Sequence, residues 1–152
     1  MIAQTIQLAL APVFVLVALG HILVTLSARL GRIVDRSRDL HGRFVASGGT
    51  ERDIVMRQMR ETDQRISLIG RALRAMVISA LGIGLTVSIL FLEELAGAVV
   101  QDLVNLQNVA GGVFLFSLGW MMWGLLLFLR ETRVALNSLK IPQEYFDDRS
   151  DA

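Results

Sequence analysis

The chain has 152 residues, of which 53% are hydrophobic, 7% aromatic and 19% charged, and its formal net charge is +1. Its apolar residues form long blocks instead of the stripes of a soluble domain, and the length suits one domain. The absence of cysteine excludes disulfides, thiolate metal sites and cysteine nucleophiles. We therefore expect a single all-α integral membrane domain over residues 1–152.

Three apolar blocks are long enough to cross a bilayer. They cover about residues 6–28, 72–92 and 109–129, and Arg74 is the one charged residue inside them. At ~1.5 Å per residue, each block spans a hydrocarbon layer of ~30 Å. The sequence therefore predicts three transmembrane helices.

Basic residues indicate how these spans are oriented. They gather between the first two spans (29–71) and after the third (130–152), whereas the first five residues and the 93–108 connection contain none. Loops rich in arginine and lysine stay on the cytoplasmic side of a membrane. We expect an N-terminus outside, with the 29–71 segment and the 130–152 tail in the cytoplasm.

The 29–71 segment, together with the adjoining ends of the spans, carries a repeating pattern on both sides of Gly48 and Gly49. Its seam residues recur at alternating steps of four and three, which is the 3.5-residue period of a coiled coil. Folding at the glycines places Ser37 opposite Thr62, where the two side chains can hydrogen-bond across the seam. We predict an antiparallel, coiled-coil-like helical hairpin with the seam Leu26, Leu30, Ile33, Ser37, Leu40, Phe44, Val55, Met59, Thr62, Ile66, Ile69 and Leu73.

Charges of alternating sign recur every four residues after the turn, at Asp53, Arg57, Glu61 and Arg65. This ladder is typical of a solvated helix edge.

Small and polar residues recur along one face of the first span. They favour close contact with a neighbouring helix, because small side chains let helix backbones approach and polar ones bond across the interface. The alternative is a pore lining, in which Phe14 is a hydrophobic constriction and His21 a titratable gate. The candidate residues of this polar stripe are Gln7, Phe14, His21, Thr25 and Arg32.

The other two spans also carry small residues at helical spacing. These predict close helix packing at Ala80, Gly84 and Ser88 in the second span and at Gly112 and Gly119 in the third. Such faces exceed what one neighbour per span requires, so we expect a homo-oligomer in the lipid bilayer.

Motifs for catalysis, phosphate loops, dinucleotides or paired-histidine metal sites do not occur in the sequence. We expect no enzyme activity, no metal and no cofactor. The arginines of the 29–71 segment are interleaved with acids and lack an aromatic platform, so nucleic acid is not an expected partner.

Two stretches, Gln7–Phe14 and Leu26–Arg38, resemble a bacterial family of small membrane proteins catalogued as a domain of unknown function. The likeness runs through all three spans and implies a three-span protein of the bacterial inner membrane, but it brings no activity or ligand. It is most specific at a basic motif of Arg29, Arg32, Asp35, Arg36 and Arg38.

These features predict a non-enzymatic, homo-oligomeric membrane protein that acts as a scaffold or assembly protein through its hairpin. One alternative is an oligomeric ion channel lined by the first span. A second is an accessory subunit that docks on another membrane protein through the third span.

Overall fold

The computed structural model describes residues 2–96 and 106–137, and all three elements in these ranges are helices. They are α1 (Ile2–Ala46), α2 (Thr50–Ala96) and α4 (Leu106–Asn137). Each is long and apolar enough to cross a membrane, and the three expected spans lie inside them. The all-helical membrane prediction is therefore confirmed for the described ranges. Most of the 93–108 connection and of the 130–152 tail lies outside them.

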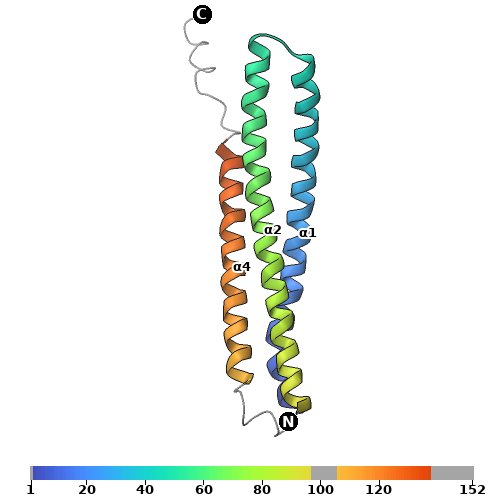
Figure 1. Cartoon of the computed structure of the whole chain (residues 1–152), viewed down its shortest axis with the longest axis vertical. Coiled ribbons are helices and arrows are strands. Elements are labelled where there is room, and N and C mark those ends of the chain that lie inside the picture. The colour runs from blue at the N-terminus through green and yellow to red at the C-terminus, as the bar shows by residue number, and fades with distance from the viewer. Residues whose placement is uncertain (1, 97–105, 138–152) are drawn as a thin grey trace, which may run out of the picture.

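Helix α2 is the centre of the molecule, because it packs against both other helices (Figure 1). Helices α1 and α2 lie side by side and are joined at residues 47–49, while α4 follows α2 and ends well short of that turn. The apolar core forms where all three helices overlap. Its fully buried side chains are Leu19, Leu26, Ala72, Met76 and Ile83.

The turn between α1 and α2 depends on glycine. Gly49 has a φ of 63°, in the left-handed region that side chains with a Cβ disfavour. The backbone N–H of Ser47 bonds the carbonyl of Arg43 at 2.9 Å and closes α1. Across the turn, the guanidinium carbon of Arg52 lies 4.5 Å from the ring centroid of Phe44, within cation–π range. Local chemistry thus reverses the chain at this point.

Burial along the α1 and α2 arms follows the period of the seam. On α1, Leu26, Ile33 and Leu40 are buried, whereas Arg32 and Arg36 are exposed. Every other seam residue is buried or half-buried. The Ser–Thr layer differs from expectation, because the Thr62 hydroxyl donates to the carbonyl of Gln58 in its own helix at 2.8 Å. That carbonyl, one turn back, is always within reach of a helical threonine.

Helices α2 and α4 approach closely through small residues. The Ser79 hydroxyl donates to the backbone carbonyl of Ser117 at 2.7 Å. A Cβ on Gly82 would overlap the Ser117 hydroxyl, and one on Gly124 would meet the side chain of Met76 at 3.1 Å. The contact face of α2 therefore passes through Ser79 and Gly82.

The small residues expected to pack the helices lie on other faces within the single chain. Ala80 is half-buried against the core, but Ser88, Gly112 and Gly119 are exposed. A Cβ on Gly84, Gly112 or Gly119 would meet nothing within 4 Å. Four-residue spacing identified a face of small residues without selecting which of two adjoining faces α4 covers. Packing of the predicted face against a second chain stays a prediction.

Candidate functional site

A charged cluster joins the three helices just beyond the apolar part of the bundle. Glu131 of α4 is fully buried, and its Oε1 accepts hydrogen bonds from Nε and Nη2 of Arg65 on α2, at 3.1 and 3.0 Å. Nη1 of Arg29 on α1 lies 3.7 Å from the other oxygen, Oε2. A buried carboxylate is costly unless it is paired. The two guanidinium groups supply that pairing from both neighbouring helices.

Arg29 makes further contacts with α4. Its Nη1 donates to the Thr132 hydroxyl at 3.3 Å, and its guanidinium carbon lies 5.2 Å from the ring centroid of Phe128. The Thr132 hydroxyl in turn donates to the carbonyl of Phe128 at 3.1 Å. Arg29 therefore connects α1 to α4 through Thr132 and Phe128 as well as through Glu131.

The cluster corrects one expectation and adds a residue that the sequence pattern missed. Arg57 and Glu61 form the exposed pair expected of the charge ladder, at 3.8 Å, but Arg65 leaves the ladder and turns inward to Glu131. Its side chain is only 28% exposed. None of the sequence patterns described above includes Glu131. The available signal was a lone acid between Arg130 and Arg133, directly after an apolar span.

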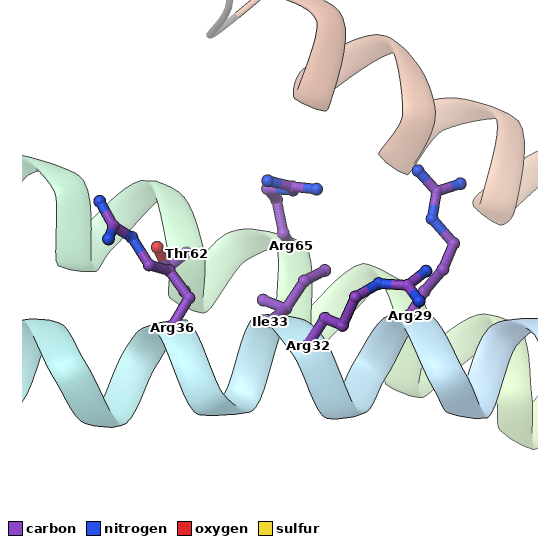
Figure 2. Close-up of a pocket in the computed structure, with 6 residues that line it drawn as sticks. All are labelled: Arg29, Arg32, Ile33, Arg36, Thr62 and Arg65. Carbon is purple, nitrogen blue, oxygen red and sulfur yellow. The ribbon is translucent and has the colours of Figure 1, made fainter.

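Beside the cluster lies a cavity of about 300 Å³, the arginine cavity, which is shown in Figure 2. Arg29 and Arg65 reach toward α4, whereas Arg32 lies along α1 and Arg36 extends toward Thr62 (Figure 2). Its lining residues are Arg29, Arg32, Ile33, Arg36, Thr62 and Arg65.

A smaller cavity of about 220 Å³ continues from the arginine cavity toward the turn and shares Arg36, Thr62 and Arg65 with it. Both cavities therefore lie between the α1 and α2 arms. The arginine cavity is lined by four arginines, and the smaller cavity is lined by Glu61 together with Arg36 and Arg65.

The structure divides the basic motif between these features. Arg29 belongs to the charged cluster, and Arg32 and Arg36 line the cavity. Asp35 points elsewhere and pairs with Arg38 on the exposed surface, where Arg38 Nη1 donates to Asp35 Oδ1 at 3.4 Å. Three residues of the motif therefore belong to the cluster or the cavity, and the other two form an ion pair on the exposed face of α1.

The polar stripe of the first span lies on the exposed face of α1. Phe14 is 69% exposed, and Gln7, His21, Thr25 and Arg32 are also exposed. His21 Nδ1 lies 3.0 Å from the carbonyl of Val17, and the Thr25 hydroxyl donates to the carbonyl of His21 at 3.0 Å. Within the stripe, His21 and Thr25 are therefore bonded to their own helix, and all five side chains are exposed beside α1.

An apolar hollow of about 400 Å³ lies on the outer face of α4, lined by Phe116, Gly119, Trp120 and Trp123. The rings of Phe116 and Trp120 meet edge to face, with centroids 6.2 Å apart. Among the described residues, no group of three or more histidine or acidic side chains could hold a metal ion.

Three helices fit to cross a membrane, tied together by a buried charge cluster, define a helical membrane protein of the multi-pass class. The chain belongs to the family described as "Protein of unknown function (DUF2721)", whose model matches residues 9–141. This confirms the resemblance, and the matched range includes the charged cluster and the arginine cavity. No curated protein and no solved structure matches the chain.

Proposed function

We propose that the protein is a non-enzymatic scaffold of the bacterial inner membrane, a homo-oligomer that assembles other components on its cytoplasmic hairpins. The observation that carries the proposal is the unpartnered face of α1. Leu19 and Leu26 are buried on one side of this helix, while Phe14 and the polar side chains of His21 and Thr25 are exposed on the other. In lipid, a polar helix face gains from contact with another helix. A second copy of the chain offers such a face.

The hairpin supplies the working surface of this scaffold. Both arms continue beyond the apolar part of the helices, and the 18 residues 29–46 would reach about 27 Å at ~1.5 Å per residue. Periodic burial along the seam favours antiparallel coiled-coil packing of the arms. The arginines of 29–71 favour a cytoplasmic position for it. A stiff charged stalk at the membrane surface suits protein assembly better than it suits catalysis.

Native mass of the full chain in lipid nanodiscs or mild detergent tests this proposal. We expect the mass of two or more chains for the wild type. Ile33→Asp places a charge in the buried seam and should abolish assembly while membrane insertion persists. Val45→Asp is the matched control, because Val45 is 77% exposed and its replacement should leave assembly intact. A monomeric wild type, or an unchanged oligomer with Ile33→Asp, would contradict the proposal.

The same measurement separates the two alternatives. A closed ring of chains favours the ion channel lined by the polar stripe. Phe14→Ala should then raise conductance by removing the constriction. Co-purification with a different membrane polypeptide favours an accessory subunit. The apolar hollow around Trp120 and Trp123 supports that alternative, and Trp123→Ala should then release the second polypeptide.

A further inference from the structure

We propose that the arginine cavity is a binding site for a phosphate group, carried by an anionic lipid headgroup or by a soluble phosphate. Four guanidinium groups from two helices line a cavity of about 300 Å³. Two of them pair with Glu131, and Glu61, which lines the adjoining smaller cavity, pairs with Arg57. Glu131 is fully buried and its Oε1 is occupied by Arg65. The cavity is therefore strongly positive.

The arginines differ in how far they are already engaged. Nε and Nη2 of Arg65 donate to Glu131, and Nη1 of Arg29 donates to Thr132 of α4. Among the described residues, no carboxylate lies within 4.0 Å of the guanidinium nitrogens of Arg32 or Arg36. The guanidinium groups of Arg32 and Arg36 therefore keep all of their N–H donors for a ligand, whereas Arg29 and Arg65 keep only some of theirs.

Guanidinium groups match phosphate in shape as well as in charge. Each presents a planar fork of N–H donors that can bond two oxygens of one phosphate. Like charges held around one cavity repel each other, and a bound anion removes that repulsion. The volume greatly exceeds the ~10–15 Å³ that a single water molecule needs, so a phosphate group fits with its bridging waters.

The cavity also lies at the level where phosphate is concentrated. Arg29 directly follows the apolar block that ends at residue 28, and Arg32 follows one turn later. Residues one turn beyond a transmembrane segment lie among the lipid headgroups. Glu131 acts as a positioning residue here, because it holds Arg65 and Arg29 in place without being accessible to a ligand.

Two probes test the site on the full-length protein. Inorganic phosphate is titrated calorimetrically into the protein in phosphatidylcholine nanodiscs, and retained phosphatidylglycerol is counted by native mass spectrometry after release from mixed nanodiscs. The double variant Arg32→Gln/Arg36→Gln should weaken binding of the occupying probe by about tenfold or more, as expected for charged hydrogen bonds. Both side chains are exposed, so helicity and elution volume should stay unchanged.

The matched control is Arg71→Gln/Arg74→Gln, which removes the same charge from exposed positions of α2 outside the cavity. It should change binding by less than about twofold, since surface charge acts weakly at physiological salt. Phosphate binding in the neutral nanodiscs identifies a soluble ligand, and selective retention of phosphatidylglycerol identifies a lipid headgroup. Equal losses in both double variants, or no binding of either probe, would overturn the proposal.

Discussion

Arg65 donates two hydrogen bonds to a single oxygen of Glu131, from Nε at 3.1 Å and from Nη2 at 3.0 Å, although 66 residues separate them in the chain. The contact ties α2 to α4 at the edge of the apolar bundle, and Arg29 adds α1 to the same carboxylate. Because Glu131 is fully buried, its interaction with these arginines depends on all three helices being assembled.

Removing the carboxylate should destabilise the bundle. Glu131→Ala leaves two half-buried guanidinium groups without their partner, and breaking a buried ion pair costs on the order of 3–5 kcal/mol. Unfolding in mixed micelles, followed by the fluorescence of Trp120 and Trp123 on α4, measures the loss. Glu61→Ala is the control, because Glu61 pairs with Arg57 on the exposed surface and should cost less than about 1 kcal/mol. Equal losses would show that the cluster does not hold α4.

Neutralising both partners should be milder than neutralising one. Arg65→Gln/Glu131→Gln keeps side chains of similar size that can bond each other, whereas Arg65→Gln alone removes the closest cation from Glu131. We expect a coupling free energy of about 1–3 kcal/mol in a double-mutant cycle measured by the same unfolding. Additive effects of the two substitutions would mean that the contact between Arg65 and Glu131 contributes nothing to stability.

Close packing of α2 on α4 predicts a sharp difference between two glycines. Gly82→Ala places a methyl group against the Ser117 hydroxyl and should destabilise by about 1–3 kcal/mol. Gly84 lies two residues further along α2, and a methyl group there would meet nothing within 4 Å. Gly84→Ala should therefore be neutral or stabilising, because alanine favours a helix by about 1 kcal/mol over glycine. Unfolding in micelles compares the two variants. Ser117→Ala should restore part of the loss from Gly82→Ala, and failure to do so would place the strain elsewhere.

The turn offers another pair of matched glycines. Gly49→Ala forces an L side chain into a left-handed φ of 63° and should cost about 1–2 kcal/mol, whereas Gly48 has no positive φ and should tolerate alanine. The readout is hydrogen–deuterium exchange of the amides near the turn, since this region can open without unfolding the spans. Faster exchange in Gly49→Ala alone is the expected result.

Membrane orientation can be read with single cysteines, because the chain has none of its own. Val45→Cys, at an exposed position close to the turn, should react with a membrane-impermeant maleimide in inverted vesicles and stay unlabelled in intact spheroplasts. Ala3→Cys, in α1 just before the first apolar block, should show the opposite pattern. Labelling of Val45→Cys from outside would reverse the topology inferred from the arginines.

Seam positions and the charged residues illustrate different limits of sequence interpretation. The expected seam positions recur every three or four residues, as a buried helix face does, and each of them is buried or half-buried. Their pairing as a coiled coil stays a prediction. The outward role given to Arg65 was wrong, because a regular four-residue ladder says nothing about a third helix that passes nearby. For the same reason, the face of α2 that contacts α4 differs from the face expected at Ala80, Gly84 and Ser88. Ser79 and Gly82 contact α4, whereas Gly84 does not.

By itself, the sequence determined the three membrane-length helices and the turn at Gly48 and Gly49, because apolar block length and glycine chemistry are local properties of the chain. Only the tertiary structure decided that Arg29, Arg65 and Glu131 share one buried site and that Arg32 and Arg36 line a cavity beside it. Residues on three different helices share no periodic spacing in the sequence that could reveal their contact. Their meeting depends on how the helices rotate about their axes, and that rotation is set by side-chain packing among all three helices.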